Sequence, residues 1–168
     1  MVPPPPAPRL VLGVDPGTHR LGWGVVYRQG SRFVHVDHGV VRAPAQAQLP
    51  ERLRVVAAGL ESVLAQHAIT VGAIEQAYVA KDPHAALVIG HARGVAMLMA
   101  ARAACTVVEY PPSVIKKAVA GTGRADKAQV SAMVRAILGL PEVPQEDAGD
   151  ALALAICHAS ALPLPPRS

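Results

Sequence analysis

The chain has 168 residues, 51% of them hydrophobic, which is enough for one domain of ordinary size with a substantial core. Sixteen Lys and Arg residues against 12 acids give a formal net charge of +4, an excess that suits a polyanionic partner without requiring one. The apolar runs are too short to span a bilayer, and Cys105 and Cys157 lie in apolar segments typical of reduced thiols. We therefore expect a soluble, cytoplasmic protein without membrane contact.

The two ends of the chain differ in composition from the rest. Residues 1–8 are rich in proline and lack the apolar core of a signal peptide, so we expect a disordered tail. Residues 163–168 form a second, short proline-rich end. Between them, residues 9–162 contain no repeat or linker and are expected to form a single domain.

The domain begins with three runs typical of short β-strands. Residues 10–15, 21–28 and 32–41 are separated by turn sequences and predict an antiparallel meander. In the third run, we expect His35 and His38 on opposite faces of the strand, as surface or core residues and not as metal ligands.

After this meander the hydrophobic period changes to that of a helix. Residues 49–68 predict an amphipathic helix, and residues 71–75 predict a short buried strand. The remaining predicted elements are a helix that begins at Asp82 and Pro83, a strand at 105–110, a helix around 130–138 and a last helix at 145–161. Three strands followed by alternating helices and strands predict an α/β fold with a mixed five-stranded sheet and helices on both faces.

Four carboxylates stand at the ends of these predicted elements. They are Asp15 at the end of the first strand, Glu75 at the end of the fourth, and Asp147 and Asp150 in the first turns of the final helix. Simpler explanations exist, because Asp15 can cap its own turn and acids near a helix N-terminus stabilise the helix dipole. However, the final helix is apolar on every side from residue 151 to 157, so it should be buried and its acids should face the domain or a cleft beside it.

Four carboxylates that three separate segments bring to one edge of a core would repel one another. Mg²⁺ or Mn²⁺, hard cations that bind oxygen, would neutralise them. Two such ions about 4 Å apart can activate water and stabilise the leaving oxygen in phosphodiester hydrolysis. We expect Asp15 to bridge the ions and Glu75 and Asp150 to complete their coordination. Asp147 could either ligate or orient the attacking water.

Basic residues surround a loop that contains glycine, at residues 120–126. They are Lys116, Lys117, Arg124 and Lys127. Gly121 and Gly123 would let the loop follow a phosphate backbone, and the alternative is an ordinary solvated basic face. The loop is not of the Walker A type, because no Gly precedes Lys127 and no Ser or Thr follows it.

Taken together, these motifs resemble one protein family. The segments GVDPGTHRLGWGVV, IEQAYVAKDPHAAL, ARGVAM, VIKKAVAGTGRADKAQV and EDAGDALALAICHA are similar, in unbroken order over residues 9–160, to the motifs of RuvC, the bacterial Holliday-junction resolvases with an RNase H-like fold. The resemblance implies an endonuclease that resolves four-way DNA junctions by paired symmetric nicks in recombination and repair, leaving 5′-phosphate and 3′-hydroxyl ends. It also implies two Mg²⁺ ions per active site, a homodimer, and RuvA and RuvB as branch-migration partners.

The resemblance also assigns individual residues. It matches Asp15, Glu75, Asp147 and Asp150 to the family's four catalytic acids. Lys116 and Lys127 match its DNA-contacting lysines, and Tyr78 takes the place of an aromatic residue that acts near the junction centre. Further candidates for DNA contact are Lys81, Lys117 and Arg124. This chain departs from the pattern with Tyr where some members have Phe, and with Gly149 where Ala is common, a change that would loosen that turn by up to about 1 kcal/mol.

The role of one helix face and the function of the chain both have alternative interpretations. Gly90 and Gly94 lie in the helix that begins near residue 82 and would form either a packing face against the sheet or a homodimer seam. The sequence VDPGT followed by a strand also resembles the phosphate-binding hairpin of actin-like kinases, but those proteins are about twice as long and have a second such domain. A non-catalytic junction-binding protein is the third possibility, although it would not need all four acids.

Overall fold

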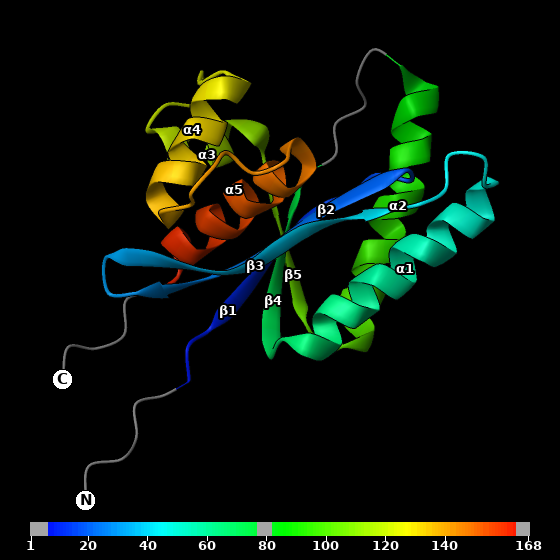
Figure 1. The fold of residues 1–168 in the computed structure, drawn as a ribbon, viewed down its shortest axis with the longest axis horizontal. Helices are drawn as coiled ribbons and strands as arrows, with labels where there is room; N and C mark the ends of the chain where they lie inside the picture. Colours follow the sequence, from blue (N-terminus) through cyan, green and yellow to red (C-terminus); the bar gives the residue numbers. More distant parts are fainter. Residues whose placement is uncertain (1–6, 77–81, 164–168) are drawn as a thin grey trace, which may run out of the picture.

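The computed structural model describes residues 7–76 and 82–163 of the chain. In this part of the chain a single sheet lies between two groups of helices (Figure 1). Its strands are β1 (Leu10–Asp15), β2 (Arg20–Gln29), β3 (Arg32–Arg42), β4 (Ile69–Glu75) and β5 (Thr106–Tyr110). The helices are α1 (Leu49–Gln66), α2 (Pro83–Arg102), α3 (Pro112–Ala120), α4 (Lys127–Leu138) and α5 (Glu146–Ala161).

The strand order is β3-β2-β1-β4-β5. The pairs β1–β2 and β2–β3 are antiparallel, whereas β1–β4 and β4–β5 are parallel, which confirms the predicted mixed five-stranded sheet. Parallel neighbours end at the same edge of a sheet. Asp15 at the end of β1 and Glu75 at the end of β4 therefore lie at one edge.

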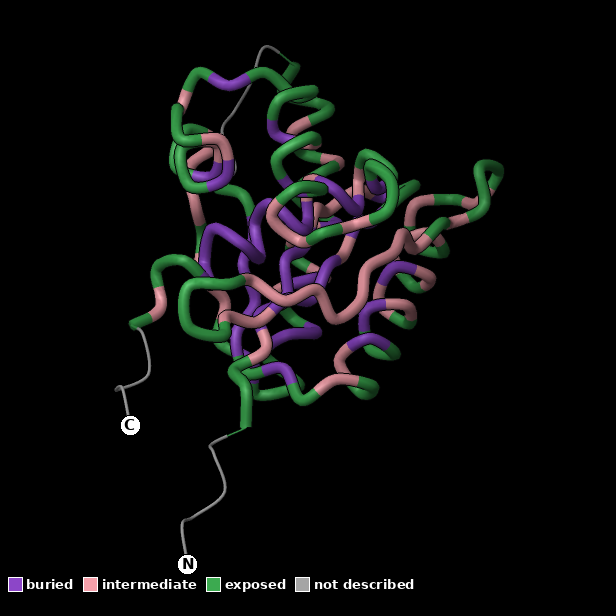
Figure 2. The backbone as a smooth tube through the Cα atoms, turned by 60° about the vertical axis from the view of Figure 1, so that its left-hand side comes forward, coloured by how far each residue is buried: buried purple, intermediate pink, exposed green. Residues whose placement is uncertain are grey.

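The two faces of the sheet carry separate hydrophobic cores. Leu12 and Val14 of β1 pack with Leu60 of α1 on one face, together with part of α2. Val11, which points the other way, packs with Leu154 of α5 and with residues of α3 and α4. Figure 2 shows the buried residues gathered in the middle of the molecule, where the sheet meets these helices. The domain is thus a three-layer structure with helices on both faces, as predicted.

Helix α5 lies directly on the backbone of β1 and β2. A Cβ atom at Gly13 would lie 1.8 Å from the carbonyl oxygen of Ala151, and one at Gly22 would lie 1.9 Å from that of Asp147. Only glycine permits such a close approach of helix and strand. Because Gly22 is also the residue that pairs with Asp15, the start of α5 lies beside the end of β1.

Helix α3 was not among the predicted elements. Pro112 occupies its first turn, and Gly121 ends it in the left-handed conformation with φ of 78°, where the Gly121 amide donates to the carbonyl of Lys117 at 2.9 Å. The helix has nine residues, and Ile115 and Val119, which stand four positions apart on one face, hold it in the core. Gly121, predicted only to let a loop follow phosphates, also terminates this helix.

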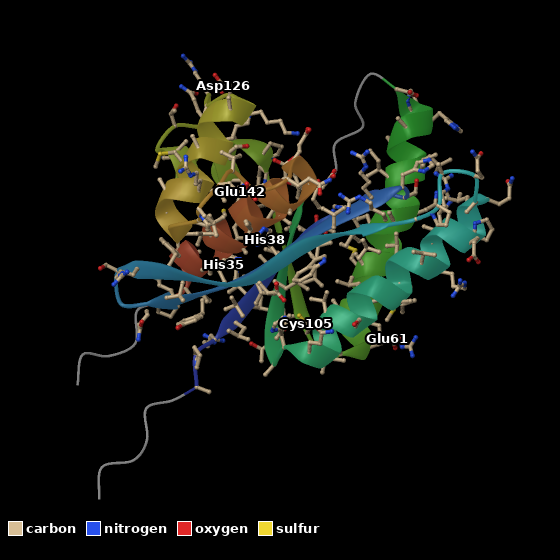
Figure 3. The ribbon with its side chains drawn as sticks, viewed as in Figure 1. His35, His38, Glu61, Cys105, Asp126 and Glu142 are labelled. Carbon is tan, nitrogen blue, oxygen red and sulfur yellow. The ribbon has the colours of Figure 1, made fainter. Side chains whose placement is uncertain are left out.

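The prediction that His35 and His38 occupy opposite faces of their strand is wrong. The register between β2 and β3 shifts at this point, because Val25 pairs with Asp37 and Val26 with His35, so β3 contains one extra residue. This β-bulge turns both imidazoles to the same side. His35 Nε2 and His38 Nδ1 are 2.8 Å apart, and Figure 3 labels the two residues along β3.

Among the described residues one helix, α2, is long and apolar enough to cross a membrane by length and composition, with a mean hydropathy of 1.3. Helices that cover the core of a soluble domain pass the same test. Ala92, Ala96 and Met99 of α2 are buried in the domain, and Arg93 pairs with Glu109 of β5. We therefore interpret α2 as a helix that covers the sheet.

The close approach of α5 predicts that a side chain at Gly22 is not tolerated. Gly22→Ala should lower the free energy of unfolding by about 1–3 kcal/mol, as overpacking does, because α5 must move away from β2. The matched control is Gly72→Ala in β4, where a Cβ would make an ordinary 3.7 Å contact with Cys105 Sγ. Urea unfolding followed by circular dichroism measures both, and equal losses would contradict the close-approach argument.

Candidate active site

Asp15 lies at the end of β1, where the turn that follows is held from the side by α1. Arg52 of α1 donates from Nη1 to the hydroxyl of Thr18 at 3.0 Å and also contacts His19 Nε2. The Thr18 side chain is buried in this contact. In the described part of the chain no turn amide donates to the Asp15 carboxylate, so the turn-capping explanation of this residue receives no support.

The other three predicted acids lie close enough to Asp15 for their charges to act on its carboxyl group. Burial, followed by the charges of Asp150, Asp147 and Glu75, raises the pKa of Asp15 to about 7, whereas the Lys127 ammonium lowers it. Burial in a poorly solvated place and nearby like charges both raise the pKa of a carboxyl group. The structure thus gathers at one edge the acids that the sequence delivers from three separate segments.

Glu75 and Asp150 both line one pocket. It is lined by Glu75, Asp150, Lys116 and Lys127 together with Pro112, Ile115, Val130, Ala153 and Leu154. Burial raises the pKa of Glu75, and the charge of Asp150 raises it further. The pKa of Asp150 is also raised, mainly by burial, although its hydrogen bond from Lys127 opposes this shift.

Lys127, a predicted DNA-binding residue, contacts one of the predicted catalytic acids. It is the first residue of α4, whose N-terminus is capped by Asp126 and Gln129. Its ammonium lies 3.1 Å from Asp150 Oδ2 and also donates to the carboxylate of Glu146. The hydrogen bond to Glu146 makes the largest contribution to raising the pKa of Lys127, and the contact with Asp150 adds to it. Lys127 therefore stays charged.

Glu146 was missed by the sequence analysis, although a signal was present. It stands four residues before Asp150 on α5, a spacing that places two side chains on one helix face. Its carboxylate accepts the Lys127 hydrogen bond, which lowers the pKa of Glu146. The partner comes from a different helix, so the pair itself could not be found from spacing.

The basic residues predicted to contact DNA differ in whether they line the pocket. Lys116 lines the pocket with Glu75, whereas Lys117 and Arg124 are exposed on the same α3–α4 segment and do not line it. Tyr78 and Lys81 lie outside the described residues.

The donor chemistry of the site fits a hard divalent cation. Carboxylate oxygens are the ligands that Mg²⁺ and Mn²⁺ prefer, and such a cation would relieve the repulsion that raises the pKa of Asp15. Across residues 7–76 and 82–163, no three His, Cys, Asp or Glu side chains converge as a ready metal-binding group. Lys127 instead occupies one side of Asp150. The residues that could hold a cation are Asp15, Glu75, Asp150 and Asp147.

Comparison with known proteins identifies the family. The family model described as Crossover junction endodeoxyribonuclease RuvC matches residues 11–158, from β1 through most of α5. The chain belongs to the RuvC family. The RuvC of Citrifermentans bemidjiense is 47% identical over 150 residues, which cover 89% of this chain and 92% of the relative. The RuvC of Syntrophotalea carbinolica is 50% identical over 149 residues, with the same coverage.

The fold agrees with that of a solved RuvC structure. Thermus thermophilus RuvC in complex with Holliday junction substrate matches with a TM-score of 0.85 and 35% identity, over 90% of this chain and 93% of that one. The agreement confirms the RNase H-like fold that the motifs implied. RuvC membership over the whole sheet also removes the actin-like kinase alternative.

The pKa of Asp15 predicts a pH-dependent stability of the protein without metal. Because about 7 lies above the ordinary value of 3.8, the folded protein keeps this proton between about pH 4 and pH 7 while the unfolded chain loses it. The free energy of unfolding should therefore fall as the pH rises through this range and level off above it. Urea unfolding with EDTA at several pH values measures this.

The matched variant is Asp15→Asn, which keeps the shape of the side chain and removes its titration. Its stability should change less with pH than that of the wild type. Some dependence should persist, because the raised pKa values of Glu75 and Asp150 act in the same direction. Identical pH slopes in the two proteins would show that Asp15 titrates at its ordinary pKa.

Proposed function

We propose that the chain is a structure-specific endonuclease that resolves four-way (Holliday) DNA junctions by hydrolysis with divalent metal ions. The observation that carries the proposal is the electrostatic coupling of Asp15 to three further carboxylates beside a pocket lined by two lysines, in a chain with RuvC motifs throughout. Relatives carry the name of this activity, and the Thermus thermophilus protein was solved with a junction. Its setting would be DNA recombination and repair in the cytoplasm.

The four acids would divide the work of holding two Mg²⁺ ions, for which Mn²⁺ is a plausible substitute. When bound, such ions activate water and stabilise the leaving 3′-oxygen, so that 5′-phosphate and 3′-hydroxyl ends result. Asp15 is proposed as the bridging ligand, because the charges of Asp150, Asp147 and Glu75 all act on its carboxyl group. Asp150 would complete the coordination with Glu75, and Asp147 would ligate or orient the water.

Basic residues beside the pocket would hold the DNA backbone. Lys116 and Lys127 line the pocket and are proposed to contact the phosphates closest to the cut. Lys117 and Arg124, exposed nearby, would contact phosphates farther away. Lys81 is proposed as a further contact and Tyr78 as a ring that stacks on an unpaired base at the crossover.

A homodimer would suit the task, because a four-way junction presents two equivalent strands to cut. The α2 helix supports this proposal. A Cβ at Gly90 or Gly94 would meet nothing within 4 Å, and Leu87 and Leu98 on the same side are 63% and 58% exposed. This face is thus not packed on the sheet of its own domain. RuvA and RuvB are proposed as branch-migration partners.

The proposal is tested by cleavage of synthetic four-way junctions labelled on both symmetric strands, with Mg²⁺ or EDTA. The wild type should nick both strands only with metal. Asp15→Asn should cleave more than about 100-fold more slowly, beyond the loss typical of changes around a metal ligand, and should still bind the junction in a gel-shift assay. Asp37→Asn, which alters an acid paired with His67 away from the site, is the control.

Each outcome of this experiment has a meaning. Binding without cleavage by the wild type in Mg²⁺ would favour the non-catalytic alternative. Full cleavage by Asp15→Asn would remove the metal-site assignment.

Lys127 should affect both binding and chemistry. Lys127→Ala should lower the slope of log K against log salt by roughly one unit, as loss of one phosphate contact does. It should also slow single-turnover cleavage at saturating enzyme, because its ammonium lies beside Asp150. Lys116→Ala should change the slope with a smaller effect on the rate.

Lys117→Ala is the matched control, because this lysine is exposed and does not line the pocket. It should change the salt slope alone. An unchanged slope and an unchanged rate in Lys127→Ala would make Lys127 part of a solvated face.

A further inference from the structure

Arg93 extends from the middle of α2 to the end of β4. Its Nη1 donates to the backbone carbonyl oxygen of Glu75 at 2.6 Å, and its Nη2 lies 2.5 Å from Glu109 Oε1 of β5. The Arg93 side chain is only 13% exposed. Its neighbours on the helix, Ala92 and Ala96, are buried, so α2 lies close enough to the sheet for this contact. One guanidinium therefore joins α2, β4 and β5.

The contact is made at the residue that follows the last pairing of β4 with β1. The parallel pairing of β4 with β1 ends at Ile74, which pairs with Val14. Beyond it, the strand pairing of β4 within the described residues is with β5, where Glu75 pairs with Tyr110 and the amide of Gln76 donates to the Tyr110 carbonyl at 2.8 Å. Arg93 supplies a hydrogen bond at this last strand residue.

Arg93 contacts the backbone of Glu75 and not its side-chain carboxylate. Arg93 contacts the carbonyl of Glu75 and pairs its charge with Glu109, not with the Glu75 carboxylate. The cations that face that carboxylate are Lys116 and Lys127. Arg93 thus acts on where the Glu75 backbone lies, while the two lysines act on the charge of its side chain.

We propose that Arg93 is a positioning residue that holds the end of β4 so that the Glu75 carboxylate meets the other acids at the metal site. Glu109 holds the guanidinium in the required direction. The planar fork of Arg can donate in two fixed directions at once, which a Lys ammonium cannot reproduce. The inference rests on the proposed function of Glu75 as a metal ligand.

Arg93→Lys tests the proposal, because it keeps the charge and removes the fork. The Mg²⁺ concentration for half-maximal junction cleavage should rise by about 10-fold or more, as when an outer partner of a metal ligand is lost. Binding of Mn²⁺ without DNA, measured by electron paramagnetic resonance, should weaken in the same direction. Hydrogen exchange at the Gln76 amide should become faster, whereas junction affinity in EDTA should be unchanged.

Two further variants keep the test decisive. Arg102→Lys alters an arginine on the same helix that lies 4.0 Å from Glu61 of α1, so it controls for general loosening of α2. Glu109→Gln leaves Arg93 in place without its partner and should give a smaller shift in metal dependence, which also serves if Arg93→Lys does not fold.

The outcomes distinguish this inference from the proposed function. Equal shifts in Arg93→Lys and Arg102→Lys, or unchanged Mn²⁺ binding in both Arg93→Lys and Glu109→Gln, would overturn the positioning role. Wild-type protein that does not cleave junctions with metal would instead overturn the proposed function.

Discussion

The site depends on the direct contact between the backbone of α5 and the backbones of β1 and β2. Gly13 and Gly22 leave no side chain between them, so the carbonyls of Ala151 and Asp147 lie where Cβ atoms would otherwise be. Because Gly22 pairs with Asp15, this contact sets the distance between the strand acid and the helix acids. Any residue larger than Gly would separate the two halves of the site.

This closeness has an electrostatic cost that the protein offsets locally. The acids raise one another's pKa values, most of all that of Asp15, and the Lys116 and Lys127 ammonium groups in the pocket oppose this. Lys127 is itself shared with Glu146. The Lys127–Asp150 ion pair could be replaced when ligands bind. A divalent ion would then pair with the carboxylates, and a DNA phosphate would pair with the ammonium.

Helix α2 has two faces with different tasks in this arrangement. Its inner face lies on the sheet through small side chains and holds the end of β4 through Arg93. Its outer face, with Leu87 and Leu98, is uncovered in a single copy. If a second copy covers that face, as proposed, the same helix connects the dimer to Glu75. Dimer formation and metal binding would then depend on one rigid element.

The sequence by itself determined the elements whose signals are local. Alternation and turn residues predicted β1 to β3, the helical period predicted α1 and α4, and Asp82 with Pro83 marked the start of α2. The acids at element ends were also identified, because strand ends and helix starts can be located along the chain. Tertiary structure alone decided the bulge that turns His35 and His38 to one side, the Lys127–Glu146 pair and the reach of Arg93 to Glu75. Each of these depends on how one segment lies against another distant in sequence, and no local pattern of residues records that contact.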